Sequence, residues 1–186
     1  MKTPHYLPFV LLFAGACLPN PQSVKERRDT FDRDSLKGSL IFDATPSGMT
    51  PVGAEFGKRV KLLGYKMDPE QPKSGDRVKV TFFWQAIAAM AEDYQVFIHG
   101  DAIAGNAPRI HGDHFPAEGQ YPTDVWQTSE VVADPFTIWI PPGYGPKQLG
   151  IYAGLYKENY RMPLTNKGSV PADNENRTQA VTITFP

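Results

Sequence analysis

The stretch from residue 93 to residue 142 decides the fold. It opens with Asp-Tyr-Gln-Val-Phe-Ile-His-Gly-Asp (93–101), continues through His-Gly-Asp-His-Phe-Pro (111–116) and closes with Glu-Val-Val-Ala-Asp-Pro-Phe-Thr-Ile-Trp-Ile-Pro-Pro (130–142). Apolar and polar residues alternate in the first and last of these segments, which is the period of a half-buried β-strand. Gly and Pro punctuate the polar segment between them. We therefore predict two strands that hold a long loop.

The same alternation continues on both sides of this stretch. It is clearest at 77–86, where Val, Val, Phe and Trp at alternate positions share one face. Further strands are predicted at 58–66, 94–101, 130–133, 136–140, 149–157 and 178–185. Residues 86–93 favour a helix by propensity, but eight residues between two strands predict a turn. Seven or eight short strands at these spacings predict an all-β, antiparallel β-sandwich of immunoglobulin or jelly-roll type.

The composition of the 186-residue chain agrees with a turn-rich β protein. It contains 18 prolines, 16 glycines and 12% aromatic residues. Lys and Arg number 19 against 20 Asp and Glu, so no basic excess attracts nucleic acid. We expect one folded domain, at 51–186, with no nucleic acid among its partners.

The amino-terminal sequence is typical of an export signal. An apolar run follows Met1-Lys2, and Ala14-Gly15-Ala16 come directly before Cys17, the only cysteine. Residues 14–17 resemble the lipobox of bacterial lipoproteins, although Ala14 stands where Leu is commoner. The resemblance implies a signal peptide at 1–16 and fatty acyl chains, palmitate among them, on Cys17. A plain secretory signal with an incidental or buried cysteine is the alternative.

Residues 17–50 are predicted to form a tether between the lipidated cysteine and the domain. Mixed charges, such as Lys-Glu-Arg-Arg-Asp at 25–29, and few large apolar side chains leave little to bury. Alternatively, the apolar side chains of this segment pack on the sandwich as an edge element. Those side chains are Leu36, Leu40, Ile41 and Phe42.

Several of these segments, taken in order, resemble a known module. They are Val-Phe-Ile-His (96–99), Gly-Asp-His-Phe-Pro (112–116), Gly-Gln-Tyr-Pro-Thr-Asp-Val-Trp (119–126), Glu-Val-Val-Ala-Asp (130–134), Ile-Pro-Pro (140–142) and Gly-Leu-Tyr (154–156). The order is similar to that of a β-sandwich module appended to bacterial polytopic membrane glycosyltransferases and found in free-standing exported proteins. The likeness covers about residues 52–185. It implies a sandwich fold and no glycosyl transfer, because the transferase portion is not seen in this sequence.

A cluster of histidines and aspartates invites a metal-site interpretation. Its members are His99, Asp101, His111, Asp113 and His114. Imidazole and carboxylate are ligands that zinc and similar ions accept. If 111–114 is extended, His111 and Asp113 share a face and His114 points away. The spacings His-x-x-x-His and His-Glu-x-x-His are missing. We therefore predict no bound metal, with Asp113 and His114 bonding the loop backbone and each other.

Three aromatic residues are candidates for ligand binding. Tyr121, Trp126 and the Tyr144 turn offer rings on which a sugar would stack, which is the basis of a carbohydrate-binding alternative. Large aromatic side chains are more often buried, and packing in the core or loop is the competing interpretation for Trp126.

The sequence contains no recognisable catalytic motif. No serine stands in a Gly-x-Ser-x-Gly elbow, and no Gly-rich loop precedes a helix. Asp113 and Glu118 form a carboxylate pair whose spacing does not indicate a glycosidase. We predict no catalytic residues and no cofactor.

These observations lead to one functional prediction and two alternatives. We expect an exported lipoprotein that acts as a non-enzymatic binding or assembly module for an envelope protein or glycan. Leu18, rather than an acidic residue, follows Cys17 and favours the outer membrane, on its periplasmic or surface side. The alternatives are a carbohydrate-binding accessory protein and a metal-dependent enzyme with a His/Asp centre.

Overall fold

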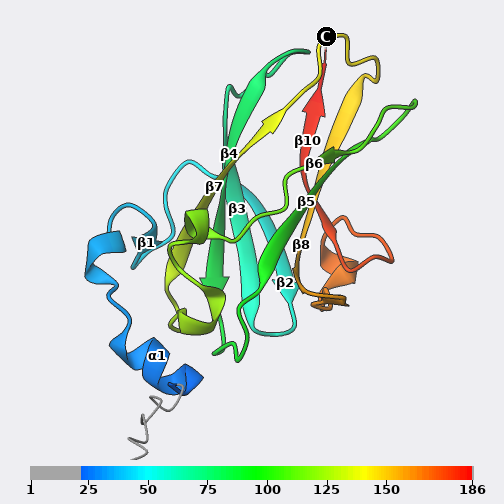
Figure 1. Ribbon diagram of the computed structural model, residues 1–186. Helices are drawn as coiled ribbons and strands as arrows, with labels where there is room; N and C mark the ends of the chain where they lie inside the picture. Colours follow the sequence, from blue (N-terminus) through cyan, green and yellow to red (C-terminus); the bar gives the residue numbers. More distant parts are fainter. Residues whose placement is uncertain (1–21, 186) are drawn as a thin grey trace, which may run out of the picture.

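A computed structural model describes residues 22–185, which form two antiparallel sheets packed face to face (Figure 1). The first sheet has the order β1-β7-β4-β3-β2, and the second has the order β10-β8-β5-β6, with β9 paired to β8. The predicted all-β antiparallel sandwich is therefore confirmed. Cys17 and the expected signal peptide lie outside the described residues.

The longest connections between strands are the loop between β6 and β7 and the segment between β9 and β10. The strands are β1 (Ile41–Phe42), β2 (Thr50–Phe56), β3 (Val60–Asp68), β4 (Arg77–Ala86), β5 (Gln95–Ala102), β6 (Ile110–His111), β7 (Val131–Trp139), β8 (Gln148–Lys157), β9 (Tyr160–Arg161) and β10 (Thr178–Thr184). The helices are α1 (Val24–Thr30) and the 3₁₀ turns η1 (Asp34–Leu36), η2 (Ala117–Gly119), η3 (Thr123–Val125) and η4 (Lys167–Ser169).

The core lies between the sheets and follows the predicted alternation. Along β4, Val78, Val80, Phe82 and Trp84 are completely buried, as expected for one face of a strand. Val96 and Ile98 of β5 point into the same core from the opposite sheet. Burying apolar surface in this way, at about 25 cal/mol per Å², is the main term that stabilises the fold.

The amino-terminal segment at 22–50 is a correction to the sequence-based prediction. Instead of a tether, its described part is packed on the sandwich, as the edge-element alternative has it. β1 pairs with β7, and Leu36, Leu40 and Ile41 are buried in the main core. Arg33, also buried, donates hydrogen bonds to the Tyr121 hydroxyl and the Val125 carbonyl. A few apolar side chains hold this charged segment together with anchored guanidinium groups, because Arg27 bonds the Asp124 carboxylate and Arg28 donates to the Met90 and Asp124 carbonyls.

Two further differences concern strands. β2 was not predicted, because Pro51 and Gly53 interrupt its alternation. The two strands predicted at 130–133 and 136–140 form the single strand β7, which runs through Pro135. Because β1 pairs only with the first residues of β7, no neighbour on that side requires an amide hydrogen from Pro135. Between β4 and β5, residues 87–94 form an irregular connection with bends and no helix, so the helical propensity of this segment is not realised.

Candidate functional site: the outer face of the second sheet

The pairing of β5 with β6 brings two histidines together on the outer face of the second sheet. His99 and His111 are directly opposite partners in this antiparallel pair, and their rings lie 5.5 Å apart, edge to face. Opposed side chains in such a pair share a face, and so does the residue two positions further along. Asp113 is that residue. One ligand atom from each of these three side chains lies within 4.8 Å of the other two.

The three side chains differ in their freedom to move. His99 is only 5% exposed and lies against the Phe97 ring at 5.1 Å, whereas His111 and Asp113 are exposed. Asp113 accepts a hydrogen bond from the Ile98 amide at 2.9 Å through one carboxylate oxygen. Burial, together with the positive charge of Arg109, lowers the pKa of His99, which favours its neutral form.

A network of arginines and carboxylates surrounds this trio. Asp101 accepts two hydrogen bonds from Arg109, at 2.6 and 2.9 Å, and one from Arg177 at 2.7 Å. Burial alone would raise the pKa of Asp101, but these two guanidinium groups hold it below its usual range. Arg177 also bonds Asp173 and lies 4.3 Å from the centre of the Tyr152 ring. Its hydrogen bonds and the ring contact fix the guanidinium in place.

A cleft of about 320 Å³ opens beside His99 and Asp113. Tyr156, Asn159 and Arg161 line its other sides. The guanidinium of Arg161 lies 4.7 Å from the centre of the Phe97 ring and bonds Glu175 at 3.0 Å. The cleft therefore combines an aromatic floor with polar walls, which is the composition of a surface that recognises a polar ligand.

His114 takes no part in this face, as the extended geometry predicted. It points inward, where its Nε2 lies 3.1 Å from Asp134, and its Nδ1 lies 2.6 Å from the Gly112 carbonyl. Burial opposes protonation, but Asp134 outweighs it, so the pKa of His114 is raised. The predicted hydrogen bond between Asp113 and His114 is wrong, because His114 pairs with Asp134 instead. Each of the two side chains bonds the backbone, as predicted.

Two of the three aromatic residues proposed as sugar platforms, Tyr121 and Trp126, are not available for stacking. Tyr121 and Trp126 are completely buried, and their polar atoms bond inside the protein: the Tyr121 hydroxyl with Glu130, and the Trp126 indole with the Tyr121 carbonyl. Tyr144 is half-buried and packs against Phe185 at 5.3 Å. Packing in the core and loop is therefore the interpretation that the structure supports for Trp126.

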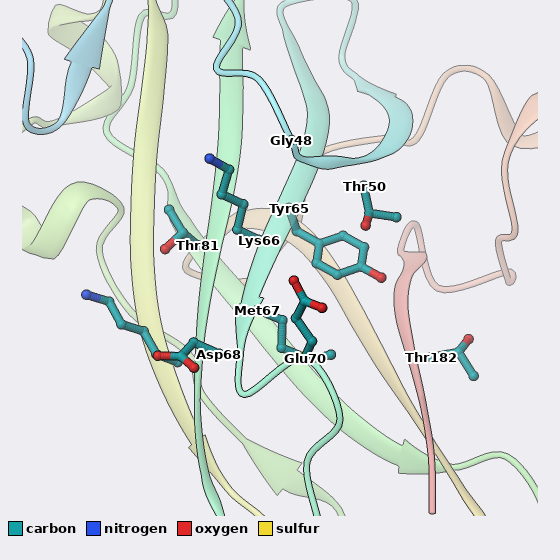
Figure 2. A pocket seen from close by; sticks show the side chains of 10 residues that line it. Gly48, Thr50, Tyr65, Lys66, Met67, Asp68, Glu70, Thr81 and Thr182 are labelled. Carbon is teal, nitrogen blue, oxygen red and sulfur yellow. The ribbon is translucent and has the colours of Figure 1, made fainter.

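A larger cleft, of about 700 Å³, lies at the open side of the sandwich between β3 and β10 (Figure 2). Tyr65, Met67 and Glu70 gather along one side of it, and Thr182 of β10 stands across from them. The cleft forms because β3 continues past the Thr50–Tyr65 pair, where its pairing with β2 ends. The sequence gives no sign that these residues lie together, because more than a hundred positions separate β3 from β10. The larger cleft shares no lining residue with the cleft beside His99 and Asp113.

Comparison with known proteins leaves the family open. No protein-family model matches the sequence, and no curated protein matches it. The likeness to the module of the membrane glycosyltransferases therefore stays a prediction. Among residues 22–185, no helix has the length and apolar character needed to cross a membrane.

Proposed function

We propose that this protein is a lipid-anchored, non-enzymatic binding module of the bacterial cell envelope, and that it recognises its partner with the outer face of the second sheet. One observation carries the proposal. Buried Phe97 and His99, together with the ion-paired Arg161, give the cleft a fixed part, beside which the exposed Asp113 and Asn159 offer polar groups to a partner. The fixed part of such a surface binds with little loss of side-chain entropy.

The state of the charged groups supports a binding role over catalysis. Arg109 and Arg177 share Asp101, so these charges already have partners of opposite sign. Asp134, the most buried carboxylate, is fully occupied in bracing the loop between β6 and β7. A general acid or base needs a group that is free to exchange a proton with a substrate. These groups are better suited to holding a surface in shape.

Site-specific photo-crosslinking in cells tests this proposal. A photoreactive residue at Asn159, which is exposed and lines the cleft, is expected to give one discrete adduct. The matched control is Thr137, an exposed residue on β7 in the other sheet, which is expected to give none. Mass analysis of the adduct distinguishes a protein partner from a glycan.

The result that contradicts the proposal is equally clear. Equal crosslinking at Asn159 and Thr137, or none at either position, means that the outer face of the second sheet is not a recognition surface. Adding Tyr156→Ala to the Asn159 protein is expected to reduce the adduct, because Tyr156 lines the same cleft.

A further inference from the structure

We propose that His99, His111 and Asp113 bind a divalent transition-metal ion, with Zn²⁺ as the best match, at the rim of the cleft beside Arg161. Two imidazoles and one carboxylate form a ligand set that zinc accepts, and three protein ligands leave a coordination position open. The use of this ion to hold a polar partner rests on the proposed function, but the binding of the ion does not. This inference differs from the sequence-based expectation of no metal.

The backbone supplies the geometry. His99 and His111 are held opposite each other by the β5–β6 pairing, and Asp113 follows on the same face. With bonds of about 2.1 Å, neighbouring ligands of a tetrahedral zinc ion lie roughly 3.4 Å apart. The ligand atoms here lie within 4.8 Å of one another, so they need to close by little more than an ångström. Rotation of the exposed His111 side chain brings its ring nitrogens closer to the other two ligands without moving either strand.

Two of the three ligands are already oriented. The buried His99 ring is held against Phe97, and the Ile98 amide holds one oxygen of Asp113, leaving its other oxygen for a metal. Such supporting contacts fix the direction of a ligand and strengthen metal binding. His111 is the ligand that moves most freely, because its side chain is exposed.

The arginines near the site are each paired with a carboxylate, which reduces their repulsion of a cation. The carboxylates of this face and its cleft are Asp101, Asp113, Glu158, Asp173 and Glu175, and the guanidinium groups are Arg109, Arg161 and Arg177. Each of the three guanidinium groups is paired with a carboxylate. Asp113 is the carboxylate that places negative charge at the site itself, because it is one of the three ligands.

One existing contact competes with the ion and is weak. A guanidinium nitrogen of Arg177 lies 3.4 Å from His99 Nδ1, at the long limit of a hydrogen bond. Arg177 keeps its shorter bonds to Asp101 and Asp173 when this contact is lost. Releasing the His99 nitrogen therefore costs little.

Calorimetric titration of the mature full-length lipoprotein in detergent, without an affinity tag, tests the site with ZnCl₂ alone. We expect one Zn²⁺ per chain. His111→Ala and Asp113→Asn change exposed side chains, so the fold is kept, and each is expected to weaken binding at least tenfold. The control is Glu118→Gln, an exposed carboxylate outside the trio, which is expected to bind as the parent protein does.

A second measurement reports the ligands directly. Co²⁺ in place of Zn²⁺ is expected to give visible absorption bands of a nitrogen- and oxygen-ligated ion, and these bands are expected to vanish in His111→Ala. Absence of Zn²⁺ binding by the parent protein, or binding unchanged in both variants, overturns the inference. Because these assays contain no partner, they succeed or fail independently of the crosslinking at Asn159.

Discussion

At the scale of single residues, Asp134 has the largest structural role outside the core. Its completely buried carboxylate accepts hydrogen bonds from the Trp84 indole at 3.0 Å and the Ala117 amide at 2.9 Å, and it pairs with His114. It thereby ties β4, β7 and the loop between β6 and β7 together. The loop is therefore held by this acceptor in addition to the apolar packing of Tyr121 and Trp126.

Replacing Asp134 is expected to destabilise the protein strongly. Asp134→Ala leaves the Trp84 and Ala117 donors buried without an acceptor, so the free energy of unfolding should fall by about 3 kcal/mol or more. Urea denaturation measures the change. Thr137→Ala, at an exposed position of the same strand, is the control and should change it by less than about 0.5 kcal/mol. A loss as small as the control's would contradict the bracing role.

Asp93 provides a prediction about pH. Burial raises the pKa of Asp93 above its usual range, while its carboxylate accepts the Thr123 amide hydrogen bond at 2.9 Å. The folded protein therefore holds this proton more tightly than the unfolded chain does. The contribution of Asp93 to the free energy of unfolding is largest below the pKa that this residue has in the unfolded chain. It decreases as the pH rises from that value to the higher pKa of the folded protein, and it stays lower at higher pH.

Asp93→Asn removes the charge and keeps the oxygen that accepts from Thr123. We expect the variant to be more stable than the parent at pH 7 by roughly 0.5 kcal/mol, since the group is half-exposed and partly screened. The difference should disappear near pH 3, where both side chains are neutral. Thermal unfolding at the two pH values measures it, and a variant less stable at pH 7 would refute the burial argument.

At the scale of elements, the close approach of β6 to β5 depends on Gly112. A Cβ at this position would lie 3.2 Å from the Ile98 Cβ and 3.3 Å from its Cγ2. Gly112→Ala is therefore expected to push the segment of His111 and Asp113 away from His99, at a cost of about 1–3 kcal/mol. Amide exchange of His114, which bonds the Val96 carbonyl at 2.9 Å, should speed up.

Gly145→Ala is the matched control for this prediction. Nothing lies within 4 Å of a Cβ at Gly145, and its φ angle is not positive. This variant should leave the exchange of His114 unchanged. If Gly112→Ala behaves like the control, the close approach of the two strands does not depend on the missing side chain.

The alternation of side chains made much of this architecture predictable. β4 has the predicted bounds, and the period of two placed His111 and Asp113 on one face with His114 on the other. What the sequence could not show depends on contacts between distant segments. β2 lacks alternation, and the burial of Arg33 follows from partners about ninety positions away. The pairing of His99 with His111 also required the register of β6, which is only two residues long.

At the scale of the whole molecule, the lipid that we propose on Cys17 would determine where the protein works. Cys17→Ala removes the only thiol available for acylation, so the protein should move from the membrane fraction to the soluble fraction. Gln22→Ala is the control and should stay with the membrane. Detergent-free fractionation of cells, followed by immunoblotting, measures the distribution. Retention of the Cys17→Ala protein in the membrane would refute the lipid anchor.

Because the amino-terminal segment is docked on the sandwich, the sandwich can lie only a short distance from the lipid that we propose on Cys17. Only six residues lie between Cys17 and Val24, where α1 begins, and the seven steps along the chain span at most roughly 24 Å in any conformation. A protein acylated at Cys17 would therefore remain within a thin shell next to the lipid head groups. Confinement to so small a volume raises the effective concentration of each neighbour in that shell, so a modest affinity would be enough for stable capture.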